Sequence, residues 1–77
     1  GRTSYGPSAD IWALGLLAYE LCTGRLPFTT EEQVARMDAP PPEERDQDLV
    51  TLVLRMLEKN PERRPTAQEV VRTLRRR

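Results

Sequence analysis

Few residues of this chain could carry out chemistry on their own. The densest groups of acids are two adjacent pairs, Glu31/Glu32 and Glu43/Glu44, and such pairs can bind a cation. They lie in polar segments or at an expected helix start, where acids more often complement the helix dipole. Nothing nearby supplies further oxygen ligands at the spacing of a metal-binding loop, so we interpret both pairs as solvated surface and predict no metal site.

Other groups that commonly serve catalysis are absent from the sequence. It has no histidine and a single cysteine, Cys22, which excludes an internal disulfide, a Ser-His-Asp triad and a Cys/His zinc cluster within these residues. There is no glycine-rich phosphate loop and no Gly-x-x-x-x-Gly-Lys run. We therefore predict no catalytic, cofactor-binding or metal-binding residue in this chain.

The charge is unevenly distributed although it sums to zero. Residues 1–54 hold four arginines against nine acids, whereas residues 55–77 hold eight basic residues against three acids. A basic end could bind nucleic acid, but the run Arg75–Arg77 is short and has no interleaved aromatic residue, so we favour a solvated helix end and predict no nucleic-acid partner. The longest apolar stretch, 11–19, is shorter than the ~20 residues that span a bilayer, so no membrane partner is predicted either.

The elements that would position functional residues are all expected to be helices. Ser8 is a suitable N-cap and Gly24 a suitable left-handed residue after the helix, which predicts a first helix over 9–23. Its apolar residues go nearly all the way round, which is typical of a buried central helix. The remaining residues are too few to cover every side of it, so the chain is predicted to be incomplete as a domain.

Three further helices are predicted from cap signals. They cover 31–37 behind Thr30, 47–59 behind Asp46, and 67–76 behind Thr66. The first and last of these begin with the Thr-x-x-Glu/Gln pattern of a capping box, and Asn60-Pro61 is the predicted stop of the middle one. No segment has the alternation of a strand, and the fold class is therefore predicted to be all-α.

Two stretches resemble motifs of the eukaryotic-type protein kinase catalytic domain. Asp10-Ile11-Trp12-Ala13-Leu14-Gly15 matches the D-x-W-x-x-G signature, and the segment after it closes with Gly24-x-x-Pro27-Phe28. About fifty residues later, Asn60-Pro61-Glu62-Arg63-Arg64-Pro65 resembles the N/D-P-x-x-R-P stretch near the end of the same domain. The order agrees with the family, and the resemblance implies that residues 1–77 are a four-helix portion of the kinase C-lobe.

The resemblance implies supporting roles for Asp10, Trp12, Gly15 and Arg64. Asp10 would accept hydrogen bonds from the catalytic loop, although it could also simply favour the start of its own helix. Trp12 would pack around the central helix that also carries Gly15. Arg64 would pair with the Glu of an A-P-E motif, which this sequence does not contain. Because an unpaired buried charge is costly, we expect Arg64 to turn outward here, or its region to lose order.

The resemblance also implies that the parent protein transfers phosphate from ATP, with Mg²⁺, to Ser or Thr of proteins. This chain has no Gly-rich loop, strand Lys, H-R-D or D-F-G motif, so we expect no activity from it alone and no ATP or Mg²⁺ bound to it. The expected partners are the parent's protein substrate or a complementary kinase segment, in an intracellular, cytoplasmic location. The alternative is a stand-alone helical module that docks on another protein through exposed apolar helix faces.

Overall fold

The computed structural model describes residues 7–76, which contain helices and no strand. The elements are α1 (Pro7–Thr23), α2 (Glu31–Arg36), α3 (Gln47–Met56), the short 3-10 helix η2 (Pro61–Arg63) and α4 (Ala67–Arg75). The predicted all-α class with four α-helices is therefore confirmed. Residues 1–6 and Arg77, the two ends of the predicted kinase portion 1–77, lie outside the described residues.

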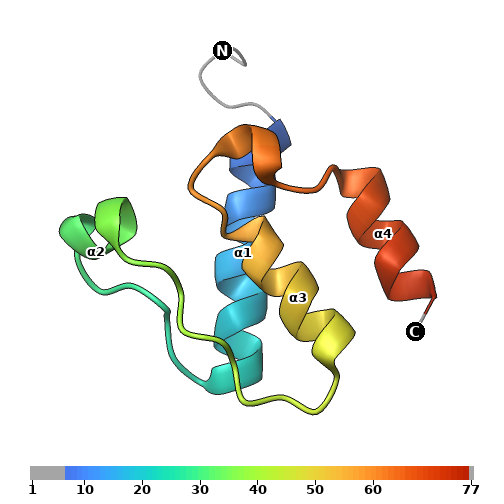
Figure 1. Ribbon diagram of the computed structural model, residues 1–77, viewed down its shortest axis with the longest axis horizontal. Helices are drawn as coiled ribbons and strands as arrows, with labels where there is room; N and C mark the ends of the chain where they lie inside the picture. The colour runs from blue at the N-terminus through green and yellow to red at the C-terminus, as the bar shows by residue number, and fades with distance from the viewer. Residues whose placement is uncertain (1–6, 77) are drawn as a thin grey trace.

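The core lies where α1 and α3 run side by side, with α2 on one side of them and α4 on the other (Figure 1). Its buried side chains form two clusters. One contains Ile11, Leu52, Met56 and Val70, and the other contains Tyr19, Val53 and Leu57. The first cluster joins α4 to the α1–α3 pair through Val70, whereas α2 contains no buried residue.

Both ends of α1 follow from single residues. The helix begins at Pro7, so the prediction that Ser8 caps it from outside was wrong. Proline suits the first helical turn because its fixed φ is already helical and the N–H that it lacks would have no partner there. At the other end, Gly24 has a φ of 78°, and its N–H donates to the carbonyl of Glu20 at 2.7 Å. The predicted left-handed glycine is confirmed.

The predicted caps of the other helices are present, one of them in altered form. Thr66 and Glu69 make the complete capping box at the start of α4. The Asp46 side chain accepts from the backbone N–H groups of Asp48 and Leu49 in the first turn of α3. At α2, the Thr30 side chain accepts from the N–H of Gln33, but the Gln33 side chain accepts from Thr29 instead of Thr30. The reciprocal half of that capping box is therefore displaced by one residue.

The third helix ends at Met56, three residues earlier than predicted. The Leu57 N–H is shared between the carbonyls of Val53 and Leu54, and the Glu58 N–H donates to Arg55, three residues back, so the last turn tightens and the helix ends there. The Arg64 side chain donates to the carbonyls of Glu58 and Lys59, at 2.7 and 3.3 Å, beyond the helix end. The helices α2 and α4 each end one residue before the predicted position, a difference that is ordinary for helix ends.

Candidate functional site

A surface hollow of about 360 Å³ lies between the first turns of α1, the helix α2 and the segment before η2. We call it the Arg64 hollow. Its walls are mostly apolar, with two cations at the edge; the lining residues are Ala9, Trp12, Val34, Ala35, Lys59 and Arg64. Two of the four residues assigned supporting roles from the sequence, Trp12 and Arg64, are thus brought together here.

Arg64 is held inward by three backbone carbonyls. Its Nε donates to Glu58, its Nη1 to Ser8 at 3.0 Å and its Nη2 to Lys59. The side chain is half-buried, so the prediction that it turns outward or loses order was wrong. Carbonyl oxygens satisfy the guanidinium without an acidic partner, and its partial exposure keeps the charge hydrated. Burial still lowers the pKa of the Arg64 guanidinium below its usual value.

An aromatic pair, Trp12 and Phe28, lies beside Arg64 and Lys59. The rings of Trp12 and Phe28 stack with their centroids 5.9 Å apart and their planes 2° from parallel. The Arg64 guanidinium carbon lies 4.9 Å from the centre of the Trp12 ring, and the Lys59 ammonium lies 4.6 Å from that of Phe28. Cations over ring faces are attracted by the ring quadrupole. Trp12 is half-buried: it packs against the core cluster of Tyr19, Val53 and Leu57 and also contacts the Phe28 ring and the Arg64 cation.

Lys59 also connects α2 to the rest of the molecule. Its ammonium donates to the carbonyl of Val34 at 2.6 Å. Phe28 was named from the sequence only as the end of the first kinase-like stretch, and no local pattern indicated Lys59 or Val34. They come together only because α1, α2 and the segment after α3 meet in space.

The Arg64 hollow suits an acidic side chain. Three of the five guanidinium N–H groups donate to the carbonyls described above, so two remain for a further acceptor. A carboxylate is the acceptor that a guanidinium binds best, and the Lys59 charge close by favours the same sign. The hollow is lined by no His, Cys, Ser, Asp or Glu, and its one amine, that of Lys59, donates to the Val34 carbonyl. Residues 7–76 contain no group of three or more His, Cys, Asp or Glu that could hold a metal ion. This lining suits recognition of an acidic group.

The other two assigned residues lie elsewhere on α1. The Asp10 carboxylate is exposed in the first turn and makes no hydrogen bond to any residue in 7–76. Gly15 is buried where α1 contacts α3. Asp10 therefore faces solvent, whereas Gly15 lies in the packed contact between α1 and α3.

The first helix is covered on one face only. A stripe of leucines on another face is exposed to 45% at Leu14, 53% at Leu17 and 78% at Leu21. The described residues 7–76 thus cover only part of this helix, as predicted, and the burial of its other faces by further segments stays a prediction. Exposed apolar surface of this extent marks an interaction surface. We call it the leucine stripe.

Comparison with known proteins shows to which family the chain with the Arg64 hollow and the leucine stripe belongs. The family model described as "Protein kinase domain" matches residues 1–74. The chain is 38% identical over 74 residues to an Aurora kinase of Candida albicans, 38% over 74 residues to mitogen-activated protein kinase kinase kinase 1 of Arabidopsis thaliana, and 40% over 74 residues to the probable serine/threonine-protein kinase PkwA of Thermomonospora curvata.

These matches cover 87% to 90% of the chain but only 10% to 14% of the relatives' own length. No solved structure matches the chain. Among the described residues, no helix is long and apolar enough to cross a membrane.

Proposed function

Because the chain belongs to the protein kinase domain family, we propose that it forms the C-terminal part of the helical lobe of a serine/threonine kinase. In the intact parent, phosphate passes from Mg-ATP to a Ser or Thr hydroxyl of a protein substrate. The name of the PkwA relative supports the choice of Ser/Thr over Tyr. The proposed contribution of residues 1–77 is to position other parts of the domain, while the chain alone is inactive.

The exposed leucine stripe is the observation that carries this proposal. A helix with apolar side chains on several faces, of which only one is covered by its own chain, fits a central helix whose remaining neighbours belong to the rest of a lobe. Burying the stripe would remove three leucine side chains from water, at about 1.5–3 kcal/mol for each fully buried side chain. The rest of the kinase domain is the neighbour that the family assignment supplies.

Two contacts with that missing part are proposed. The Arg64 hollow receives the Glu of the A-P-E motif, which would use the two remaining guanidinium N–H groups. The exposed Asp10 carboxylate accepts hydrogen bonds from backbone N–H groups of the catalytic loop and so restrains it. Both residues act on catalysis through other segments and are positioning residues.

The described residues do not fit ATP or Mg²⁺. No cluster of metal-ligating side chains occurs in residues 7–76, and the sequence has no glycine-rich loop to cradle phosphates. Both cofactors would therefore be held by other segments of the parent, and we derive no step of phosphate transfer from this chain.

The test compares the chain alone with the extended protein encoded in frame with it. The extended protein is expected to transfer labelled phosphate from ATP to a general protein substrate, and the chain alone is not. Asp10→Asn should lower kcat of the extended protein by roughly tenfold, as expected when a supporting hydrogen-bond partner is lost. A Glu20→Gln variant, which changes an exposed acid at the far end of α1, should leave kcat unchanged.

Three results would overturn the proposal. One is phosphate transfer by the chain alone, the second is an extended protein that folds but transfers nothing, and the third is a coding sequence without upstream H-R-D and D-F-G motifs. In the second and third cases, a cooperative thermal unfolding of the chain with little binding of an apolar dye would favour the stand-alone interaction module.

A further inference from the structure

The last helix has a basic face that the kinase assignment leaves without a role. Only Val70 of α4 is buried, and the neighbouring Val71 and Leu74 remain 47% and 43% exposed. A hollow of about 480 Å³ runs along this face. Its lining combines two small or apolar residues, Ala67 and Val71, with four longer polar side chains: Gln68, Arg72, Arg75 and Arg76. We call these six residues the α4 basic face.

The positive charge of this face is not neutralised within the described chain. Glu69 is the only acid in α4, and its carboxylate accepts from the N–H of Thr66 at 2.8 Å in the capping box. Within residues 7–76, Arg72, Arg75 and Arg76 make no ion pair with any acid. Three guanidinium groups are therefore available to an external anion.

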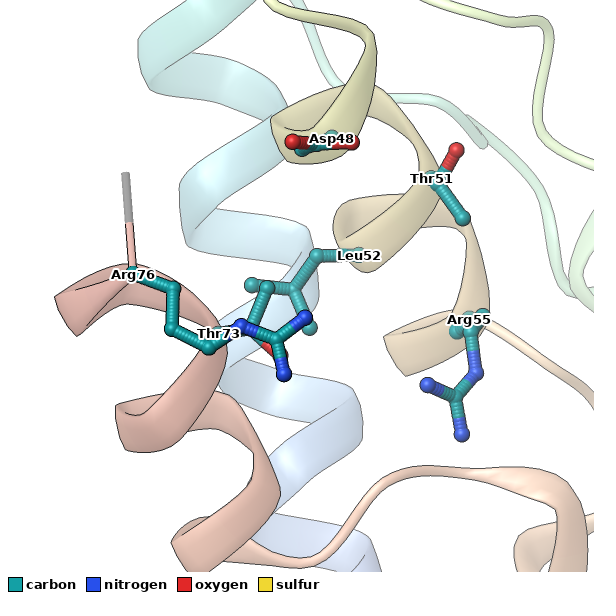
Figure 2. Close-up of a pocket in the computed structure, with 6 residues that line it drawn as sticks. All are labelled: Asp48, Thr51, Leu52, Arg55, Thr73 and Arg76. Atoms are coloured by element: carbon teal, nitrogen blue, oxygen red, sulfur yellow. The ribbon is translucent and has the colours of Figure 1, made fainter.

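The positive charge of the α4 basic face extends into the groove between α3 and α4, where Arg55 lies. A second hollow, of about 270 Å³, lies there, and Figure 2 shows the Arg76 guanidinium extending over Leu52 with Arg55 beyond it on α3. Thr51 and Thr73 add hydroxyl groups, and Asp48 is the one acid that lines this hollow. Arg76 lines both hollows, so the two form one cationic surface.

We propose that the α4 basic face docks an acidic peptide segment of a partner protein, in which an apolar side chain stands between carboxylates. Charge complementarity carries the assignment, since guanidinium groups bind carboxylates through paired N–H donors. The apolar lining at Val71 gives a place for the apolar side chain. The inference is independent of the proposed kinase function, because it uses only α4 and the neighbouring side of α3.

A peptide fits this face better than other anions do. Nucleic acid offers no apolar side chain for Val71, α4 has no aromatic residue on which a base could stack, and Asp48 would repel a dense row of phosphates. An anionic membrane would require a broader apolar surface than Val71 and Leu74 provide. Duplex DNA and lipid vesicles are therefore the competing ligands in the test.

The binding test uses the full 77-residue chain and fluorescence anisotropy of labelled synthetic peptides. One peptide places Leu among Glu residues at helical spacing, a second contains Glu only, and a third replaces each Glu of the first by Lys. The Glu/Leu peptide is expected to bind several-fold more tightly than the Glu-only peptide, and the Lys/Leu peptide not at all. Absence of binding by both acidic peptides would overturn the proposal.

Variants locate the binding on α4. Arg72→Gln/Arg75→Gln should weaken binding of the Glu/Leu peptide by about fivefold or more at low salt, since each exposed charge contact contributes modestly. Glutamine removes the charge without placing an acid at the negative end of the helix, so the fold is retained. Arg25→Gln, at an exposed position after α1, is the matched control and should not change the affinity.

Three outcomes would contradict the proposal that the α4 basic face docks an acidic peptide. They are tighter binding to duplex DNA, tighter binding to phosphatidylserine vesicles, and salt-sensitive self-association of the chain, in sedimentation, that the Arg72→Gln/Arg75→Gln variant abolishes.

Discussion

Gly15 of α1 lies so close to Met56 of α3 that a Cβ at Gly15 would stand 2.9 Å from the Met56 Cβ and 3.0 Å from a methyl carbon of Leu57. The Met56 Cβ is fixed to its backbone and cannot move aside without moving α3. The glycine therefore sets the distance between the two central helices.

Gly15→Ala should lower the free energy of unfolding. Alanine alone would raise helix stability by about 1 kcal/mol, but forcing the helices apart costs typically 1–3 kcal/mol, so we expect a net loss of about 1 kcal/mol in urea unfolding. Ala13→Gly, at an exposed position of the same helix, is the control for propensity and should cost about 1 kcal/mol. A Gly15→Ala variant more stable than the parent chain would contradict the close contact.

Lys59→Met should release α2. The substitution keeps an apolar stem beside Phe28 but removes the hydrogen bond to the Val34 carbonyl and the cation over the ring. Because α2 buries no residue, little else holds it, and amide exchange of residues 31–36 should become several-fold faster while that of α3 is unchanged. Arg36→Met, on α2 itself but without a contact of this kind, is the control. Equal protection in the two variants would show that Lys59 is not the attachment.

Thr66→Ala should weaken the start of α4. It removes the side-chain oxygen that accepts from the N–H of Glu69, and the loss of such a cap costs about 1 kcal/mol. The measurement is urea unfolding followed by circular dichroism. Thr51→Ala, at an exposed position of α3 where no cap is lost, should change the free energy by less than about 0.5 kcal/mol.

Arg64→Lys should destabilise the chain even though it conserves the charge. A single ammonium cannot reach the carbonyls of Ser8, Glu58 and Lys59 in the geometry of the guanidinium, and hydrogen bonds from a charged donor contribute about 1.5–3 kcal/mol each. We expect a loss of about 2 kcal/mol in urea unfolding, since the lysine keeps part of these contacts. An unchanged free energy of unfolding would mean that the three bonds contribute nothing.

The stabilising effect of Arg64, relative to Arg64→Lys, should not vary with pH near neutrality. Burial lowers the pKa of Arg64 in the folded chain. The unfolded chain therefore binds more protons than the folded chain only in the strongly alkaline range, between the folded and the unfolded pKa. Only in that range does the free energy of unfolding rise with pH. Between about pH 6 and pH 9 the guanidinium is protonated in both states. Urea unfolding at several pH values in this range checks the expectation, and a difference between the two proteins that changes with pH would contradict it.

Local signals in the sequence were sufficient for the elements and for most of their ends. Gly24, Asp46 and Thr66 each act within one helical turn, so their roles could be predicted from neighbouring residues alone. The end of α3 was not predicted correctly, because its last turn tightens at Leu57 and Glu58, before the stop signal at Asn60-Pro61 is reached.

The candidate site was only partly predictable, because its contacts join residues that are distant in the sequence. The motifs named Trp12 and Arg64, but the expectation that Arg64 turns outward assumed that only a carboxylate could satisfy it. Three backbone carbonyls do so instead, and their arrangement follows from tertiary structure. Phe28 and Trp12 belong to the same kinase-like stretch of the sequence, but the stacking of their rings also follows from tertiary structure and not from a local signal.

The connection between Phe28 and Asp46 has a consequence for how such a chain can change over evolutionary time. The Tyr19 hydroxyl donates to the carbonyl of Pro40 at 2.7 Å and holds the segment after α2 in place, while α2 itself contains no buried residue. Lengthening a flexible connection costs only about 0.6 kcal/mol for each doubling. Inserted residues between Thr29 and Asp38 could therefore acquire new recognition elements while the helices that build the core keep their places.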